Sequence, residues 1–210
     1  KIKKRRKAAS YKPQAASALK RTQLKSRIKT WKENYGHWTI KKNRRHSRRN
    51  SANNKKGYGY ACLKGMDYIA KQKKQPDIIV FLDGDYSDYP EELTKIVAPI
   101  IENDIDFVIG ARVEEFRAKN SMTPQQIFGN WLATTLMRIF FNAKFTDLGP
   151  FRAIKYNKLI ALNMEDKTYG WTVEMQLKAI KKNYSYVEIP VHYKNRIGVS
   201  KVSGTVKGSV

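Results

Sequence analysis

The chain has 210 residues, enough for one sizeable domain, and its 41% hydrophobic and 11% aromatic content is typical of a globular protein rather than a disordered one. The single cysteine, Cys62, excludes an internal disulfide and favours a reducing compartment. No apolar run approaches the roughly 18 residues of a membrane-spanning helix.

The formal net charge of +24 is unevenly distributed along the chain. Residues 1–56 hold 21 of the 42 Lys and Arg and a single acid, Glu33, which gives them a charge of +20. Residues 57–210 hold the other 21 bases and 17 acids, a balance of +4. We therefore separate a basic segment, 1–56, from an ordinary domain, 57–210. A disordered tail and a nonspecific nucleic-acid-binding tail are both open interpretations of the basic segment.

From residue 57 onward, apolar residues recur with the periods of helices and strands. We predict helices near 57–70, 90–101, 128–140 and 173–180, and strands near 78–82, 106–110, 151–154 and 186–193. The order of these elements predicts an α/β fold with a mostly parallel sheet. The third helix has a broad aromatic stripe, for which we favour a core-facing position over a membrane-surface one.

The strongest local signal is the sequence Asp83-Gly84-Asp85, directly after the first predicted strand. Open α/β sheets bind ligands beyond the carboxyl ends of their strands. Two carboxylates at this position can converge on one Mg²⁺ or Mn²⁺ ion, which in turn can hold a diphosphate. The alternative is an acidic surface turn, because Asp-Gly is a common turn pair.

Several other polar residues are candidates for the site, each with a structural alternative. The segment 193–201, with Arg196, Ser200 and Lys201, could make a phosphate-binding loop, but on spacing alone we favour a solvated basic loop. Arg112 follows the second strand and is either an anion ligand or a surface arginine. The other two candidates are a helical carboxylate and a loop carboxylate, Glu174 and Asp147.

Residues 57–210 resemble the family 2 glycosyltransferases of the dolichyl-phosphate mannose or glucose synthase type. Six blocks in the same order carry the resemblance, which makes it far more specific than any one motif. The blocks are KGYGYACLKG (56–65), FLDGDYSDYPEEL (81–93), FVIGAR (107–112), TDLGPFRAI (146–154), YGWTVEMQ (169–176) and RIGVSKVSGT (196–205).

The resemblance implies a GT-A nucleotide-sugar-binding fold in which Asp83 and Asp85 bind Mg²⁺ or Mn²⁺ and the nucleotide diphosphate. Ser87 stands where such synthases often have a metal-binding glutamine, so we leave the third protein ligand unassigned. The resemblance also implies contacts to donor or acceptor from a set of polar residues, namely Arg112, Asp147, Arg152, Arg196, Ser200 and Lys201.

The implied reaction is transfer of a hexose from a nucleotide-sugar donor to a polyprenyl (dolichyl-type) phosphate, by in-line displacement at the anomeric carbon. Because the acceptor phosphate is already anionic, we group Glu174 with the catalytic residues as a positioning group rather than as a base. We expect a cytoplasmic protein, peripheral at the membrane surface, that acts in cell-envelope glycan biosynthesis and has no specific nucleic-acid partner.

The family's N-terminal half-domain, which holds the nucleobase and ribose, is unreadable in residues 1–56, and the family usually continues beyond residue 210. One hypothesis is that residues 1 to about 55 are a frameshifted translation of that half-domain. Two competing hypotheses for the whole chain are an inactive remnant of the transferase fold and a basic nucleic-acid-binding protein.

Overall fold

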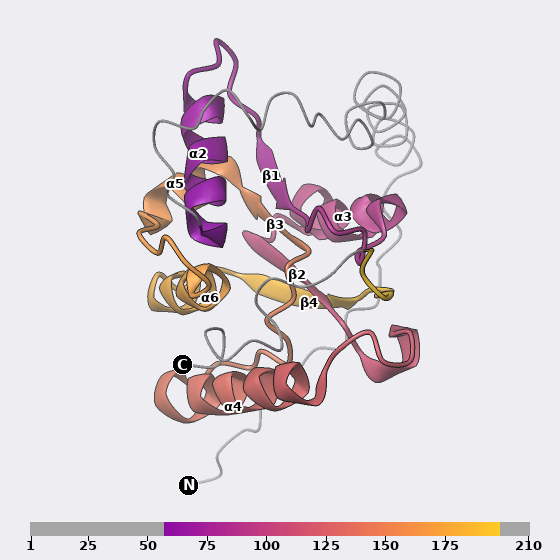
Figure 1. Ribbon diagram of the computed structural model, residues 1–210. Coiled ribbons are helices and arrows are strands. Elements are labelled where there is room, and N and C mark those ends of the chain that lie inside the picture. The colour runs from indigo at the N-terminus through magenta and orange to yellow at the C-terminus, as the bar shows by residue number, and fades with distance from the viewer. Residues whose placement is uncertain (1–56, 198–210) are drawn as a thin grey trace, which may run out of the picture. The chain divides into compact units, whose positions relative to one another are not determined.

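The computed structural model describes residues 57–197, which form a four-stranded sheet with helices on both faces (Figure 1). The strand order is β1-β3-β2-β4. The strands are β1 (Ile78–Phe81), β2 (Phe107–Ala111), β3 (Arg152–Lys155) and β4 (Tyr186–Pro190). The predictions for residues 1–56 and for Ser200 and Lys201 lie outside the described residues.

The direction of the strands corrects one part of the prediction. β3 pairs antiparallel with both β1 and β2, whereas β4 pairs parallel with β2. Strands β1, β2 and β4 therefore point the same way, and β3 runs against them. The α/β class is confirmed, and three of the four described strands share one direction, as the prediction of a mostly parallel sheet requires. Two of the three strand pairings in this described sheet are nevertheless antiparallel, because β3 lies between β1 and β2.

Five α-helices connect or flank these strands in the described residues. They are α2 (Tyr58–Ala70), α3 (Leu93–Asn103), α4 (Pro124–Phe141), α5 (Tyr156–Leu162) and α6 (Trp171–Lys181). Two short 3₁₀ helices, Pro90–Glu92 and Glu114–Phe116, precede α3 and α4. The sequence predicted each of the α-helices except α5, a seven-residue helix that follows β3 without a loop.

The alternation of side chains along the strands creates two hydrophobic clusters, one on each face of the sheet. Phe107, Ile109 and Ile154 face α2, α5 and α6, where Trp171 is completely buried. Val108 and Ala153 point to the opposite face, which α3 covers. The sheet is therefore buried on both faces, which explains the short, continuous apolar strands in the sequence.

The aromatic stripe of helix α4 does not face the core, as the sequence predicted, but is exposed. Its only buried residues are Thr134 and Met137, whereas the aromatic stripe, including Phe128, Trp131 and Phe140, is exposed by 58% to 72%. Figure 1 shows the helix beside α6 and beyond β4 rather than on a face of the sheet. The prediction of a core-facing stripe is therefore wrong. No helix in the described part of the chain is both long and apolar enough to span a bilayer.

Candidate active site

The acidic turn predicted from the sequence begins immediately beyond β1. The carboxyl ends of β1, β2 and β4 lie at one edge of the sheet because these strands share a direction. β3 runs in the opposite direction, so its first residue, Arg152, lies at the same edge and pairs with Phe81 and Ile109. This topology gathers Asp83, Arg112 and Arg152 from three separate segments.

Asp85 is the best connected residue of the acidic turn. One carboxylate oxygen accepts hydrogen bonds from the backbone N–H of Ser87 at 3.0 Å and from its hydroxyl at 2.6 Å. The other oxygen lies 3.5 Å from Nε of Arg196. The backbone N–H of Ile197 also donates to the carbonyl of Asp85 at 2.9 Å. The turn and the start of the predicted phosphate loop are thus in direct contact.

The pKa of Asp83 reflects its crowded electrostatic surroundings. Burial raises this pKa, and the negative charge of Asp85 raises it further. The positive charges of Arg112, Arg196 and Arg152 act in the opposite sense. A cation placed between the two carboxylates would relieve their repulsion, so the electrostatics of the turn fit a metal-binding role.

Asp88 is a buried carboxylate that hydrogen-bonds to the backbone of the acidic turn. The sequence did not predict it as a site residue. It is 1% exposed, and one of its oxygens accepts a 3.2 Å hydrogen bond from the backbone N–H of Asp83. Its other oxygen has no hydrogen-bond partner among the described residues. Burial raises the pKa of Asp88 to about 7. Asp88 also bridges to Tyr193, so it ties the acidic turn to the segment after β4.

Lys194 lies between two aromatic rings of the same turn. Its Nζ is 3.4 Å from the ring centroid of Tyr86 and 4.5 Å from that of Tyr89. The backbone N–H of Lys194 donates to the carbonyl of Ser87 at 2.9 Å. Tyr86 has a positive φ of 66°, an uncommon conformation for an aromatic residue. Lys194 belongs to the segment 193–201, which the sequence identified as a candidate phosphate-binding loop. The spacing of residues did not predict its contact with Tyr86 and Tyr89.

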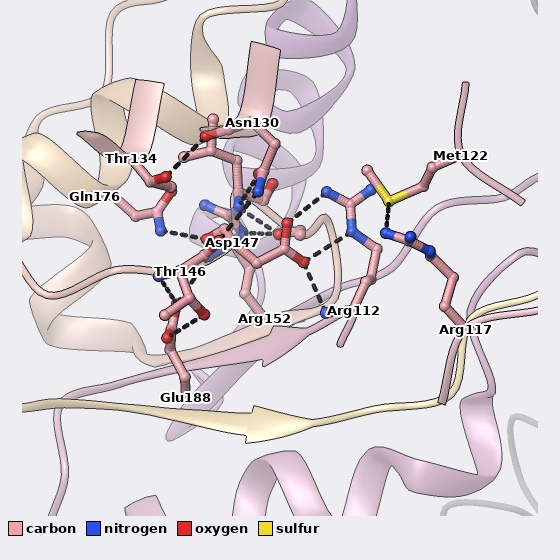
Figure 2. Close-up of polar contacts among 12 residues, drawn as sticks. Arg112, Arg117, Met122, Asn130, Thr134, Thr146, Asp147, Arg152, Gln176 and Glu188 are labelled. Atoms are coloured by element: carbon pink, nitrogen blue, oxygen red, sulfur yellow. Dashed lines mark hydrogen bonds and ion pairs between the residues drawn. The ribbon is translucent and has the colours of Figure 1, made fainter. Parts of the chain in front are cut away.

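Arg112 and Asp147 form a closed ion pair (Figure 2). Nε and Nη2 of Arg112 donate to the two carboxylate oxygens at 2.8 and 2.7 Å, and its backbone N–H donates to one of them at 2.8 Å. Burial alone would raise the pKa of Asp147, but the hydrogen bonds and charge of Arg112 lower it. The pair therefore fastens residues 146–149 to the end of β2, and the predicted contacts of Arg112 and Asp147 with a substrate stay predictions.

Residues 146–149 form hydrogen bonds with helix α4, helix α6 and strand β4, as Figure 2 shows. Asn130 of α4 donates to the carbonyl of Thr146 and accepts from the N–H of Leu148. Gln176 of α6 donates to the carbonyl of Asp147 at 3.0 Å, and Glu188 of β4 accepts from Thr146. This loop therefore connects α4, α6 and the sheet through hydrogen bonds.

Gly149 explains why this loop can approach β2 so closely. A Cβ at this position would lie 2.4 Å from the carbonyl oxygen of Gly110 and 2.9 Å from a carboxylate oxygen of Asp147. No side chain fits there without moving the backbone of β2 or breaking the contact between Arg112 and Asp147. The block TDLGPFRAI therefore reflects packing requirements as much as chemistry.

Arg152 is 1% exposed and is used to hold the same loop. Its guanidinium donates to the carbonyl oxygens of Leu148, Gly149 and Thr172. Burial lowers its pKa to about 10. These hydrogen bonds give Arg152 a role in holding the loop, and its predicted contact with a substrate phosphate stays a prediction.

Glu174 holds the loop before α6, and its predicted positioning role in the reaction stays a prediction. Its two oxygens accept from the backbone N–H groups of Glu165 and Asp166, both at 2.8 Å, and it pairs with Lys178 at 2.6 Å. Burial would raise the pKa of Glu174, but the Lys178 and backbone hydrogen bonds lower it. These contacts fasten the loop before α6 and leave no free oxygen directed to the acidic turn.

Comparison with known proteins decides the family. The sequence model described as Glycosyl transferase family 2 matches residues 27–162. The chain belongs to glycosyl transferase family 2. The match begins inside the basic segment, and the division of the chain at residue 57 remains a prediction. Family membership together with the α/β sheet confirms the predicted GT-A fold class.

Curated relatives in this family match about three quarters of the chain. An undecaprenyl-phosphate mannosyltransferase from Micrococcus luteus is 29% identical over 160 residues, which cover 73% of this chain and 64% of that protein. A polyprenol monophosphomannose synthase from Mycolicibacterium smegmatis is 26% identical over 156 residues, covering 72% and 58%. The chain thus spans less than two thirds of the length of these two relatives.

Solved structures give a more distant comparison. A glucosyl-3-phosphoglycerate synthase from Mycobacterium tuberculosis, in complex with Mn²⁺ and uridine-diphosphate-glucose, is 15% identical to this chain. The alignment covers 69% of this chain and 47% of that one, with a TM-score of 0.48. At this level the comparison supports no assignment of residues.

The acidic turn offers two carboxylates for a candidate metal site, and the metal-binding role of Asp83 and Asp85 stays a prediction. Asp83 and Asp85 supply carboxylates, but no cluster of three or more His, Cys, Asp or Glu ligands is present in residues 57–197. The hydroxyl of Ser87, which stands at the position of the expected glutamine, donates to Asp85, and the third protein ligand stays unassigned. A hard cation bound by two carboxylates would fill its other positions with water and donor phosphate oxygens.

A pocket of about 560 Å³ lies beside the acidic turn. Residues of α2, including Tyr58, Cys62 and Met66, form one wall, and β1 with Asp83-Gly84-Asp85 forms the other. The volume is within the usual range for a small-molecule site. The acidic turn therefore stands at the boundary of a hollow that is mostly apolar.

Proposed function

We propose that the chain is a hexosyltransferase that moves a hexose from a nucleotide-sugar to a polyprenyl phosphate at a membrane surface. The observation that carries the proposal is the contact between the acidic turn and Arg196, in a family 2 domain. The names of the relatives from M. luteus and M. smegmatis support mannose as the hexose and a polyprenyl phosphate as the acceptor.

Asp83 and Asp85 are the residues we assign to a Mg²⁺ or Mn²⁺ ion. Such an ion would neutralise the charge that develops on the diphosphate leaving group. Ser87 orients Asp85 through its hydroxyl and backbone N–H, and Asp88 fixes the backbone of Asp83. The two ligands are thus held in place by second contacts before any substrate binds.

Arg196 and Lys194 are the cations that we assign to substrate phosphates. Both belong to the segment that runs along the acidic turn, and both side chains are partly accessible. In the proposed reaction an acceptor phosphate oxygen attacks the anomeric carbon, and the bond from that carbon to the diphosphate oxygen breaks. The attacking oxygen already carries negative charge, so no residue has to remove a proton.

Ser200, Lys201 and the basic segment enter this proposal only as predictions, because they lie outside the described residues. We keep Ser200 and Lys201 as candidate phosphate ligands next to Arg196. We do not assign Glu174, Asp147, Arg112 or Arg152 to the reacting atoms, since each holds the scaffold through the contacts described above.

The test is a transfer assay with the full chain, a panel of nucleotide-hexoses, a short-chain polyprenyl phosphate and Mn²⁺. We expect a labelled polyprenyl-phosphate hexose with at least one donor, and no product when chelator is in excess. Titration calorimetry with Mn²⁺ and nucleoside diphosphates measures donor-site binding separately. The absence of both transfer and diphosphate binding would contradict the proposal.

A further inference from the structure

Helix α4 carries a continuous apolar surface that the fold does not bury. Six large side chains lie on one side of the helix at spacings of three and four residues and are between 40% and 72% exposed. We call this surface the α4 outer face, and it consists of Phe128, Trp131, Leu132, Leu136, Ile139 and Phe140. Apolar patches of this kind mark interaction surfaces in proteins.

The orientation of α4 is fixed by polar contacts on its inner side. Asn130 bonds to the backbone of Thr146 and Leu148, and Met137 enters the core cluster next to α6. A capping box at Thr123 and Gln126 fixes the start of the helix. Rolling the helix to bury its aromatic side would break these contacts, so the outward position of the α4 outer face is specified by the fold.

The chain segment that contains α4 carries charges of one sign. Residues 116–146 contain no Asp or Glu but four bases, Arg117, Lys119, Arg138 and Lys144. From α6, the Nζ of Lys181 lies 5.7 Å from the ring centroid of Phe141 at the end of the helix. Helix α4 itself holds one base, Arg138, and no acid, and Trp and Phe lie on its exposed apolar side, a combination found in helices that lie in a membrane interface.

The chemistry of the face favours lipid over a protein partner. Phe128 and Trp131 pack side by side, with their ring centroids 5.8 Å apart, at the start of the helix. Amphipathic rings prefer the boundary between head groups and acyl chains, and the stems of Lys and Arg reach from there to lipid phosphates. Eighteen helical residues give a length of about 27 Å, enough to lie flat across several lipid head groups.

We propose that the α4 outer face docks on an anionic bilayer, with the helix axis parallel to the membrane plane. This proposal rests on the proposed function, because a polyprenyl phosphate presents its head group at that surface. Asn130 connects the docked helix to residues 146–148, and Asp147 holds the end of β2 through Arg112. Docking would therefore set the height of the acidic turn above the lipid phosphates.

The experiment is co-sedimentation of the full chain with vesicles of phosphatidylcholine, with and without phosphatidylglycerol, at low and at high salt. We expect the basic segment to bind anionic vesicles through its charge, and that contribution should fall with salt. We expect binding that persists at high salt, and the double variant Ile139→Glu with Phe140→Glu should lose about tenfold or more of it. The same two charges at exposed sites elsewhere, Tyr68→Glu with Tyr169→Glu, should have little effect.

A second readout reports the depth of the helix. Brominated lipids should quench the fluorescence of Trp131. In a background where Trp31 and Trp38 of the basic segment are both replaced by Phe, the Trp131→Tyr variant should lack that quenching, because the remaining Trp171 is fully buried. Equal high-salt binding by the wild type and the Ile139/Phe140 double variant would overturn the proposal. So would a wild-type dimer that this double variant converts to a monomer, because a second copy would then cover the face.

The two proposals fail in different ways. Transfer to a water-soluble short-chain acceptor needs no vesicle, so its loss in the wild type contradicts the proposed function and not the docking. Conversely, full transfer to the soluble acceptor by a protein that does not bind vesicles at high salt contradicts the docking alone.

Discussion

Two arginine–aspartate pairs lie at the same edge of the sheet and differ in almost every physical respect. Arg112 and Asp147 are joined by hydrogen bonds of 2.7 to 2.8 Å, and their side chains are only 11% and 6% exposed. Arg196 and Asp85 are 3.5 Å apart at their nearest charged atoms and are 32% and 25% exposed. The first pair is closed, and the second is open to solvent.

The difference separates residues that build the site from residues that act in it. In a closed, buried pair the two side chains hydrogen-bond to each other. Removing one of them leaves the other as a buried charge without a partner. An open pair keeps donors and acceptors free for a ligand and loses little when the partner moves. We therefore expect the closed pair to control stability and the open pair to control activity.

The largest expected effect is on stability, from Asp147→Ala. This substitution leaves Arg112 buried without its partner, and we expect a loss of about 3–5 kcal/mol in the free energy of unfolding. Denaturant unfolding measures it. Asp104→Ala is the matched control, because Asp104 also pairs with a base, Lys155, but its side chain is 95% exposed. Equal losses in the two variants would contradict the comparison.

The next effect is on activity, from Asp85→Asn. The substitution keeps the shape of the side chain but removes a charge, and we expect transfer to fall by about 100-fold with the free energy of unfolding nearly unchanged. Initial rates at saturating Mn²⁺ measure it. Wild-type rates in this variant, or a loss of activity that merely follows unfolding, would remove Asp85 from the site.

The sequence was sufficient to predict the acidic turn, because the turn and its strand are contiguous. An apolar run followed by Asp83-Gly84-Asp85 indicates both the strand and its exposed end, and the structure places them so. The same holds for α3, whose apolar stripe, including Ile96 and Ile100, is buried as its period indicates. Local patterns report such features directly.

Pairings between distant segments were not accessible to the same reasoning. Nothing in the spacing of Arg112 and Asp147 shows that they meet, because 35 residues separate them. The insertion of β3 between β1 and β2 depends on tertiary packing, since the residues of a four-residue strand do not indicate whether it pairs parallel or antiparallel. The outward orientation of α4 follows from contacts of Asn130, which a hydrophobic period does not record.

Glu174 offers a third test, in which stability and activity should separate again. Glu174→Ala removes the acceptor for two backbone N–H groups, and we expect a loss of about 1–3 kcal/mol in unfolding free energy. The transfer rate per folded molecule should not change. Glu165→Ala is the control, because Glu165 is 73% exposed and its oxygen lies 3.7 Å from the same Lys178. A drop in rate with unchanged stability would restore a catalytic role for Glu174.

A smaller effect is expected from pH. The pKa of Asp147 is lower in the folded chain than its usual value near 3.9, so its contribution to stability is present above that value and is lost as pH falls through the folded pKa. The stability difference between wild type and Asp147→Ala should therefore be constant at neutral pH and shrink below about pH 4. Unfolding curves at several pH values measure it, and a constant difference down to pH 3 would show that Asp147 does not carry the charge.

The smallest effect concerns the open pair itself, through Arg196→Ala. Its guanidinium is partly solvated and lies 3.5 Å from Asp85. We therefore expect the binding of a phosphate-bearing substrate to weaken by about 1 kcal/mol, which raises its KM on the order of fivefold. The effect should shrink as salt is added, because exposed charges are screened. Lys119→Ala removes an exposed positive charge from another loop and is the control for net charge. If Arg196→Ala destabilises the fold as strongly as Asp147→Ala, the second pair is also closed in solution, and the division between building and acting residues fails at this edge of the sheet.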